Sequence, residues 1–577
     1  MVVIAEELAK KQREISVAEF FERNRHLLGF DNPRKALLMV VKEAVDNSLD
    51  AAEEARILPE INVEIIKLEE KRFRVIIEDN GPGIVRKQIP KIFAKLLYGS
   101  KFHKLSSTRG QQGLGISAAV LYSQLTTGKP ATVLSKIGKG QKAHLFKLKI
   151  NTKTNNPDVI EDTEQEWEGK EHGVRIEVDL EGEYMKGRQS VDEYLKETAI
   201  VNPHATIIYT NPEAQQIIFP RATEQLPPEI KEIQPHPYGV ELGMLMKMLE
   251  TTEGRTLQQF LTTEFVRVGP GTAKEICQNA ALLPNTKPKE VSRDMAEQLY
   301  KGIQKTKIIA PPTDCISPIG AELLEKGLRK EINAEFYTAV TRPPEVYRGN
   351  PFVIEVAIAY GGEQNAEETI RILRFANRVP LLYQQVACAI INAIQNTAWR
   401  AYGLQQSNNA LPAGPAMIVI HISSVWVPFT SESKEAIAHY PEIIKEVKLA
   451  LQECGRRLGM FVNKKRRIGE EFKKRSFIEK YIPHVADALK NIIGLPETKK
   501  KEVEEKLAEI LEHTRGELEE IGIDNPDYDP ELAKIGREEE DEEEKEGEKE
   551  EERSKAAPED KEEPKTKKGK EKQTKLK

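Results

Sequence analysis

The spacing of apolar and polar residues predicts an alternation of helices and strands over the first 230 residues or so. Between residues 33 and 55, apolar side chains recur every three or four positions, as on one face of an amphipathic helix. The next segment, INVEIIKLEEKRFRVIIED, alternates and predicts two strands joined near residues 69–71. A turn (DNGPGI), a helix around KIFAKLLYGS, a second apolar helix (AAVLYSQL) and strands in ATVLSKI, HLFKLKI, HGVRIEVDL and ATIIYT follow. This order predicts an α+β sandwich, with helices on one face of a largely antiparallel sheet.

A proline-rich junction, LPPEIKEIQPHPYG, predicts a domain boundary. Beyond it, helical periodicity is interrupted at Gly254 and at the Gly-Pro-Gly turn of residues 269–271, which indicates a small all-α module. From IIAPPTDCISP onward strands and helices alternate again, with strands predicted in PFVIEVAIAYGG and AMIVIHISSVWVPF and a helix beginning near Ser431. The segment PEIIKEVKLALQECGRRLGMFV then starts a long, increasingly basic helical region that extends to about His513.

Composition narrows the class of protein. A chain of 577 residues is long enough for several folded units, and no apolar run approaches the ~18 residues that a membrane span needs. The first residues, MVVIAEELAKKQREISVAEF, lack the apolar core and cleavage site of a signal peptide, so a soluble, cytoplasmic protein is expected. The four cysteines form no CxxC pair, which predicts packed thiols rather than a disulfide scaffold or a zinc module.

The formal net charge of −6 is shaped by the last segment of the chain. From about Arg537 the sequence is nearly free of apolar residues, first acidic and then lysine-rich. Such a segment cannot bury enough surface to offset its ordering entropy, and we expect a disordered tail. Without it the body is closer to neutral, so the global charge does not exclude a DNA partner.

One helix face combines polar groups with possible chemistry. In EAVDNSLDA, Glu43, Asn47 and Asp50 lie opposite the apolar side of the predicted helix. Taken alone, this pattern is also typical of a solvated face. A second motif changes the balance, because the strand FRVIIED delivers Asp79 into the glycine-containing turn DNGPG, where a flat ligand could approach closely.

A glycine-rich loop, GQQGLGIS, opens the next apolar helix. Its exposed amides and the helix dipole could receive phosphate oxygens. The chain contains no GxxxxGK[ST] loop and no GxGxxG turn after its first strand, which excludes phosphate-loop and Rossmann folds as the explanation. The polar helix, the aspartate turn and the glycine loop, in this order, therefore indicate a different nucleotide site.

These three motifs resemble the nucleotide-binding boxes of the GHKL ATPases, which include gyrase, the ninety-kilodalton heat-shock chaperones, MutL proteins and histidine kinases. HGVRIEVDL, with Gly173, is similar to the fourth box, although Val174 stands where threonine is frequent. The implied cofactors are ATP and Mg²⁺.

The resemblance implies a role for each matching residue. Glu43 would be the general base that orients the attacking water, and Asn47 would supply a magnesium ligand. Asp79 would accept a hydrogen bond from the adenine amino group, in a turn whose Gly81 and Gly83 belong to the nucleotide site.

The phosphate lid follows from the same resemblance. Ser100 and Lys101 would lie near its hinge, while Asp50 is a support residue of undefined role. The implied lid comprises Gly110, Gln111, Gln112, Gly113, Leu114, Gly115, Ile116 and Ser117.

Lys434 is predicted to lie in the first turn of a helix that follows the strand SSVWV. The positive end of a helix dipole disfavours a cation there by a few tenths of a kcal/mol, and a nearby anion would reverse that preference. An exposed lysine is the simpler alternative. The resemblance implies instead that Lys434 is the transducer lysine that reaches the γ-phosphate, with Lys305 and Lys307 as the next candidates.

The order of parts resembles one branch of this superfamily, the B subunits of type IIB DNA topoisomerases (topoisomerase VI). SKFHKLSSTRGQQGLGISAAVLYSQ, QPHPYGV and FTSESKEAIA carry the similarity, which covers residues 1 to roughly 500. The implied domains are a GHKL ATPase domain with an N-terminal arm (1–229), a helix-two-turns-helix module (230–306), a transducer with a stalk helix (307–495), a helical extension (496–535) and the disordered charged tail (536–577).

The resemblance also implies partners. An A subunit carrying the DNA-cleaving tyrosine would join this chain in an A2B2 heterotetramer, so we expect no strand cleavage by this polypeptide alone. ATP would dimerise the GHKL domains, with the N-terminal arms crossing between protomers. This ATP-operated gate would pass double-stranded DNA and relax supercoils.

Several alternatives stay open at the level of sequence. The basic stretch GRRLGMFVNKKRR, with Arg456, Arg457 and residues 464–467, either neutralises DNA phosphates or is a solvated stalk. The helical insert either contacts DNA or serves packing. A chaperone or mismatch-repair role would share the ATPase core but leaves the helical insert unexplained, and a histidine kinase would need a phosphoacceptor helix before it. A DNA-associated scaffold with an inactive site is the non-enzymatic alternative.

Overall fold

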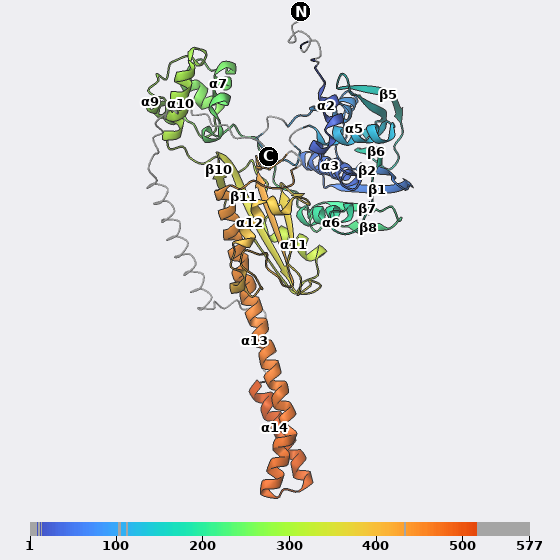
Figure 1. Cartoon of the computed structure of the whole chain (residues 1–577), viewed down its shortest axis with the longest axis vertical. Helices are drawn as coiled ribbons and strands as arrows, with labels where there is room; N and C mark the ends of the chain where they lie inside the picture. The colour runs from blue at the N-terminus through green and yellow to red at the C-terminus, as the bar shows by residue number, and fades with distance from the viewer. Residues whose placement is uncertain are drawn as a thin grey trace, which may run out of the picture. The chain divides into compact units, whose positions relative to one another are not determined.

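The computed structural model describes residues 9, 12, 14–101, 105–110, 113–431 and 434–515 (Figure 1). The chain divides into two compact units, Met1–Phe461 and Val462–Lys577, and each is described by itself. All four cysteines lie in the described ranges, where they are buried and free, which confirms the expected packed thiols. No helix within the described ranges is both long and apolar enough to cross a membrane.

An antiparallel sheet organises the N-terminal part of the first unit. Among the described residues it has eight strands in the order β5-β4-β3-β6-β2-β1-β7-β8, and β1 and β7 are the parallel pair. The strands are β1 (Glu60–Glu69), β2 (Arg72–Asp79), β3 (Ala131–Lys136), β4 (Ala143–Asn151), β5 (Asn156–Gln165), β6 (Gly173–Glu181), β7 (Thr206–Thr210) and β8 (Gln216–Phe219). The predicted largely antiparallel sheet is confirmed, whereas the sequence interpretation missed β5 and β8.

One face of this sheet is covered by helices. Along β1, Ile61, Val63 and Ile65 are buried while Ile66 and Leu68 are exposed, as a strand with one covered face requires. The helices of this part are α2 (Val17–Arg23), α3 (Pro33–Glu54), α4 (Ile89–Ala94), α5 (Gly115–Thr127) and α6 (Val191–Val201), with a 3₁₀ turn, η1, at Arg25–Leu28. Helices α3 and α5 pack directly on the sheet, which confirms the predicted α+β sandwich.

Helices α3 and α4 differ in how closely their bounds follow the prediction. Helix α3 begins where predicted, because Asn32 caps it by accepting a hydrogen bond from the Lys35 amide and Pro33 suits the first helical position. The helix predicted around KIFAKLLYGS is shorter than expected: α4 ends at Ala94, and Leu97 adopts a left-handed backbone with φ of 58°.

The all-α module predicted after the proline-rich junction is present. Its helices are α7 (Leu242–Thr251), α8 (Leu257–Glu264), α9 (Pro270–Asn279) and α10 (Arg293–Lys305), with 3₁₀ turns η2 (Pro237–Gly239) and η3 (Pro288–Glu290). Leu257, Phe260, Ile276 and Leu299 belong to a hydrophobic core of its own. The more specific helix-two-turns-helix assignment stays a prediction.

A second sheet lies in the C-terminal part of the first unit. Among the described residues it has six strands, ordered β10-β11-β14-β12-β13 with β9 also paired to β11. The strands are β9 (Phe336–Thr341), β10 (Glu345–Tyr347), β11 (Asn350–Tyr360), β12 (Arg371–Ala376), β13 (Val379–Pro380) and β14 (Ala416–Ser424). Helix α11 (Ala321–Glu331) packs on β9 and β11 and also on α6, so the two sheets are joined through a helix pair. Helix α12 (Ala389–Gln395) and the 3₁₀ turns η4 (Gln385–Ala387) and η5 (Trp399–Tyr402) precede β14.

The helix predicted to begin near Ser431 is wrong. After β14 the backbone folds back on itself, with the Thr430 amide donating to Ala436 O at 2.9 Å and the Ala438 amide donating to Pro428 O at 2.7 Å. Lys434 has a left-handed backbone with φ of 54°, which a helix excludes. The helix begins instead at Pro441, which suits a first helical position and lacks the N–H that a preceding helical turn would need.

The long helical region is confirmed as α13 (Pro441–Ile493) followed by α14 (Glu497–Arg515). In the first unit, buried residues repeat along one side of α13 at Ile443, Val447, Leu451, Cys454 and Leu458, which is a helical stripe. In the second unit, the two helices are tied by the Lys500–Asp487 ion pair at 2.6 Å. The expected tail, 536–577, lies outside the described residues, as do residues 516–535 of the expected extension.

Candidate active site

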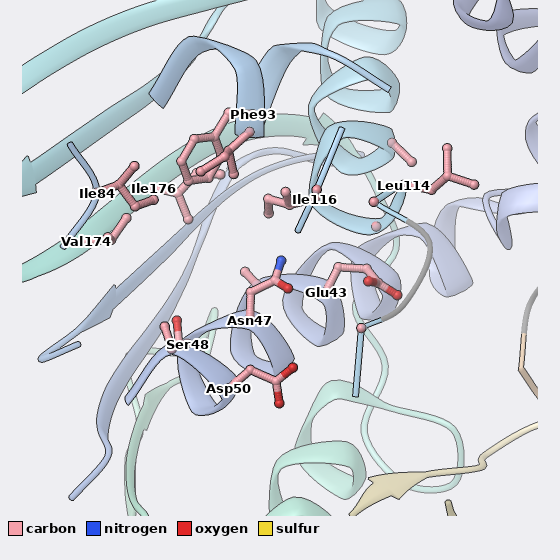
Figure 2. A pocket seen from close by; sticks show the side chains of 18 of the residues that line it. Glu43, Asn47, Ser48, Asp50, Ile84, Phe93, Leu114, Ile116, Val174 and Ile176 are labelled. Carbon is pink, nitrogen blue, oxygen red and sulfur yellow. The ribbon is translucent and has the colours of Figure 1, made fainter. Parts of the chain in front are cut away.

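A cavity of about 610 Å³ opens over helix α3 and gathers most of the residues that the sequence singled out (Figure 2). Its volume lies in the range of ~300–1,000 Å³ that small-molecule sites occupy. Of the predicted site residues, those lining it are Glu43, Asn47, Asp79, Gly83, Ser100, Lys101, Gly110, Gly113, Leu114, Gly115, Ile116 and Lys434. Gly81 and Ser117 do not line it, and Gln111 and Gln112 lie outside the described residues.

Helix α3 presents Glu43 and Asn47 to this cavity. The two residues are four positions apart, which places them one turn from each other on the same face, and both side chains point into the cavity in Figure 2. Lys42 also lines the cavity, and its Nζ atom lies 3.4 Å from Glu43 Oε1 and 3.0 Å from Asp46 Oδ2. The predicted polar face is therefore a cavity wall, and Lys42 is a member that the sequence interpretation missed.

Asp79, at the end of β2, is fixed at the bottom of the cavity. It is 5% exposed and accepts hydrogen bonds from Ser48 Oγ (2.7 Å), the Gly81 amide (2.9 Å) and the Val174 amide (3.1 Å). Burial raises the pKa of Asp79, and these three hydrogen bonds offset part of the effect. Gly81 therefore contributes to the site through its amide, which holds the carboxylate of Asp79. Val174, which stands where threonine is frequent, contributes its backbone amide in the same way.

Two glycines near Asp79 are required by close backbone approach. Gly83 has φ of 74°, and a Cβ atom there would lie 2.1 Å from Lys136 O on β3. Gly173 has φ of 146°, and its Cβ would lie 2.2 Å from Asp79 O. Gly83 was expected to belong to the nucleotide site. The structure adds a second reason for a glycine at this position, because any side chain would clash with β3.

The start of α5 lies directly against the catalytic candidate on α3. A Cβ atom at Gly115 would lie 1.8 Å from Glu43 Oε2, so a glycine is needed there. Leu114 precedes the helix without a side-chain cap, which leaves the first amides of α5 available to a ligand. Ser117 is instead buried beneath the turn and donates to Leu114 O at 3.0 Å.

Asp50 is not on a solvated face, contrary to the simpler interpretation of its helix. It is 7% exposed and accepts from Lys101 Nζ at 2.8 Å and from Arg109 Nη1 at 2.7 Å. Lys101 also pairs with Glu54 at 2.9 Å. Burial alone would lower the pKa of Lys101, but its two carboxylate partners raise it above the usual value. Asp50 therefore fastens both ends of the segment that precedes the glycine loop.

Lys434 reaches the cavity from the loop after β14. Its Nζ atom donates to Arg109 O at 3.2 Å. Burial lowers the pKa of Lys434, and the nearby charge of Glu43 offsets only part of this. A lysine with a left-handed backbone and a desolvated ammonium group is a strained arrangement of the kind that clusters at functional sites. Lys305 and Lys307, the other candidates, do not line this cavity.

Apolar side chains form a slot beside Asp79. In Figure 2, Ile84, Phe93, Ile176 and Val174 group together on the side of the cavity away from Glu43. The sequence pattern predicted that these apolar residues belong to the packed core of strands and helices. Hydrophobic periodicity does not distinguish residues that line an apolar slot from residues buried in a core. An apolar slot with a buried acceptor at its end suits a flat, nitrogen-containing ring.

Comparison with known proteins decides the family. Residues 32–152 match a family model described as "Histidine kinase-, DNA gyrase B-, and HSP90-like ATPase", and residues 311–474 match "Topoisomerase VI B subunit, transducer". The B subunit of type 2 DNA topoisomerase 6 from Methanococcoides burtonii is 50% identical over 533 residues, covering 92% of this chain and 81% of that protein. The chain belongs to the family of type 2 DNA topoisomerase 6 B subunits.

Further members of this topoisomerase family agree. The Archaeoglobus fulgidus member is 49% identical over 505 residues, covering 87% of this chain and 83% of that one. Among solved structures, the ATPase region of Saccharomyces cerevisiae topoisomerase II is 11% identical and covers 78% of this chain and 100% of that one with a TM-score of 0.38. At that score the likeness carries no weight for fold or function.

Membership confirms the expected GHKL ATPase and transducer parts and, with them, an ATP-hydrolysing type IIB topoisomerase B subunit. Most residues that line the cavity lie in the matched ATPase part, and Lys434 lines it from the matched transducer part.

Proposed function

We propose that the cavity binds ATP with Mg²⁺ and that Glu43 and Lys434 act together on the bound nucleotide. One observation carries the proposal: Glu43, from the ATPase part, and Lys434, from the transducer part, line the same cavity. A cleft built by two domains, with a carboxylate and a partly desolvated ammonium group, suits a ligand whose charge changes during turnover.

Asp79 and the apolar slot would bind the adenine ring. The carboxylate of Asp79, oriented by Ser48 and two backbone amides, would accept a hydrogen bond from the exocyclic amino group. Ile84 and Ile176 would cover the faces of the ring. A carboxylate offers about four acceptor positions, and three of those on the buried Asp79 are already filled. A ring that lacks the amino group would leave the remaining buried position unfilled, which is an effective means of discrimination.

The phosphates would lie between Asn47 and the glycine loop. The amides at the start of α5, from Gly115 onward, would receive phosphate oxygens together with the rest of the lid, including Gln111 and Gln112. Ser100 and Lys101 would hold its hinge. Asn47 presents an amide oxygen to the cavity, and this fits Mg²⁺, which takes few protein ligands and completes its shell with phosphates and water. When bound, Mg²⁺ would neutralise phosphate charge.

Glu43 would orient the attacking water, and Lys434 would pair with the γ-phosphate. An ammonium group prefers a phosphate oxygen to a neutral carbonyl, because the negative charge of the phosphate adds a Coulomb attraction that a carbonyl dipole lacks. Lys434 would therefore leave the carbonyl of Arg109 when ATP arrives and lose its partner when phosphate departs. Loss of that contact would release the transducer, as in other γ-phosphate switches.

We propose the domain limits 1–229, 230–306, 307–495, 496–535 and 536–577. They are supported by separate cores: one runs from Ala18 to Phe219 and another from Val240 to Ile308.

The helical module would pack against the transducer rather than read DNA. In the basic stretch, Arg457 donates to Ala339 O on β9 at 3.1 Å and pairs with Glu453 at 2.8 Å, so this residue fastens α13 to the sheet.

The assembly would be an A2B2 heterotetramer that works in the cytoplasm. ATP would dimerise the ATPase domains, and the A subunit would supply the tyrosine that cleaves double-stranded DNA. This part of the proposal is supported by relatives that are named as B subunits of type 2 DNA topoisomerase 6.

The experiment is a plasmid assay on the chain purified with its co-expressed A subunit. Supercoiled plasmid is incubated with the complex and ATP, with the complex without ATP, and with the chain alone plus ATP. We expect relaxation only in the first mixture. Relaxation by the chain alone, or by the complex without ATP, would contradict the proposed gate.

A further inference from the structure

The segment that precedes the glycine loop is held by the transducer part. The Ser107 amide donates to Cys315 O at 2.9 Å, and the hydroxyls of Ser107 and Ser423 lie 3.4 Å apart. Thr108 O accepts a hydrogen bond from Asn377 Nδ2 at 3.3 Å. The described residues 105–110 therefore form the base of the lid and are fixed to a domain other than the one that supplies most of the cavity.

Arg109, within this lid base, is buried, and both of its terminal nitrogens donate hydrogen bonds. Its guanidinium donates to Asp50 Oδ1 at 2.7 Å, to both carboxylate oxygens of Glu53 at 2.7 and 2.9 Å, and to Asn202 Oδ1 at 2.6 Å. Burial would lower its pKa, but Glu53 and Asp50 raise it above the usual value, so the group stays charged. Forked contacts of this kind fix the orientation as well as the position of an arginine.

The hydrogen bonds of Arg109 connect the lid base to two other parts of the site. Asp50 and Glu53 lie on α3, the helix that presents Glu43 and Asn47 to the cavity. The backbone carbonyl of Arg109 accepts the hydrogen bond from Lys434 Nζ at 3.2 Å. Arg109, a member of the lid base, thus contacts both the helix of the proposed base and the proposed transducer lysine.

We propose that Arg109 is a positioning residue that sets Lys434 relative to Glu43. Its side chain locks the lid base to α3, and its carbonyl provides the acceptor for the ammonium group of Lys434. Because that acceptor is neutral, it holds the ammonium group at the cavity without competing with a γ-phosphate. The proposal rests on the proposed function, since it concerns the same lysine.

The same contacts predict what loss of the guanidinium does. Without it, Asp50 and Glu53 lose a shared partner, and the carbonyl of Arg109 is no longer fixed in space. Lys434 would then be displaced from its position, and misplacement by about 1 Å can cost on the order of 100-fold in rate. Nucleotide binding by Asp79 and the apolar slot does not depend on Arg109, so affinity should change little.

The test compares ATP turnover and nucleotide affinity in Arg109→Gln, Arg109→Lys and wild type, each as the full chain in its A-subunit complex. Affinity is measured with a fluorescent, non-hydrolysable ATP analogue. We expect kcat of Arg109→Gln to fall roughly 10- to 100-fold with a change in affinity below about threefold. Arg109→Lys keeps the buried charge, and therefore the fold, but loses the fork; we expect partial recovery of kcat.

A matched control is Arg74→Gln. Arg74 also makes a forked pair, with Asp179 at 2.7 and 3.1 Å between β2 and β6, but lines no part of the cavity. We expect wild-type kcat from this variant. An equal loss of kcat in Arg74→Gln and Arg109→Gln would overturn the proposal, as would a loss confined to affinity.

A double variant separates positioning from general damage. If Arg109 acts through Lys434, the variant carrying both Arg109→Gln and Lys434→Gln should be no slower than Lys434→Gln alone. Multiplying losses would overturn the proposal. A normal rate in Lys434→Gln would contradict the proposed function itself, whereas a slow Lys434→Gln beside a normal Arg109→Gln would contradict only the role of Arg109.

Discussion

The Nζ atom of Lys434 lies 3.2 Å from the carbonyl oxygen of Arg109 and donates a hydrogen bond to it. The lysine side chain therefore lies at the cavity, held by a neutral acceptor. Burial lowers its pKa, and the charges around it are those of Glu43, Lys42, Asp46 and Asp50. Any anion that enters the cavity must therefore change the pKa of Lys434.

A first prediction concerns protons. A γ-phosphate beside Lys434 raises the lowered pKa toward or above the usual ~10.4, so at alkaline pH nucleotide binding should take up a proton. Affinity should then fall as pH rises through the pKa of the empty site, because the neutral amine is the form without the phosphate contact. Calorimetry of a non-hydrolysable ATP analogue in buffers of different ionisation enthalpy measures this uptake. Lys434→Gln should abolish it; identical uptake in that variant would assign the proton to another group.

The carboxylate of Glu43 should matter for turnover and not for binding. A positioned general base contributes ~10²–10⁴-fold, so Glu43→Ala should lower kcat by about that factor while ATP affinity is kept. Steady-state hydrolysis and equilibrium binding separate the two effects. Glu64→Ala, at an exposed position of β1, is the control and should behave like wild type. Unchanged turnover in Glu43→Ala would remove Glu43 from the mechanism.

Gly115 should tolerate no side chain. Because a Cβ atom there would lie 1.8 Å from Glu43 Oε2, Gly115→Ala must displace the carboxylate or the start of α5. We expect turnover to fall by roughly 100-fold, as for other displaced catalytic groups. Gly271→Ala is a matched control in the first turn of α9, where a Cβ would meet open space. Its turnover should equal that of wild type, and equal loss in both variants would point to folding instead.

Glu197, at the contact of α6 with the second sheet, should make stability depend on pH. Burial, and after it the charge of Glu193, raises its pKa to about 8 against the lowering effect of Arg371, 3.9 Å away. The folded state then holds a proton that the unfolded state releases above its ordinary pKa, so stability declines as pH rises from about 4.5 to about 8 at roughly 1.4 kcal/mol per pH unit.

Removal of that charge is the corresponding test. Glu197→Gln should raise Tm relative to wild type at pH 8.5 and leave it nearly unchanged at pH 5, as measured by thermal unfolding at both values. Glu64→Gln, at an exposed position of β1, is the control and should show no such pH-dependent gain. A pH-independent difference for Glu197→Gln would mean that the buried group is not proton-linked.

Much of the site could be predicted because its elements are local. The cap at Asn32, the face of α3, the strand that ends at Asp79 and the glycine loop each have a signature of a few residues, and resemblance supplied their roles. Lys434 was assigned to this site by resemblance, but its predicted helix was wrong. After β14 the chain turns back on itself instead of continuing into a helix.

The remaining features depend on contacts between distant segments. Asp50 has the position of a solvated residue on its helix, and its burial follows only from Lys101 and Arg109. Arg109 itself stands in a loop without periodicity, so its contacts with Glu53 and Asn202 left no trace in the pattern. Strand β5 was missed since most of its residues are exposed and carry little apolar alternation.

The most direct measurement is ATP turnover, beside nucleotide affinity, in the Lys434→Gln variant of the full chain in its complex. The account places the proposed base and the transducer lysine at one nucleotide, so kcat should fall by on the order of 100-fold or more while affinity for a non-hydrolysable analogue changes far less. Turnover equal to wild type would contradict the account, because Lys434 would then have no part in hydrolysis.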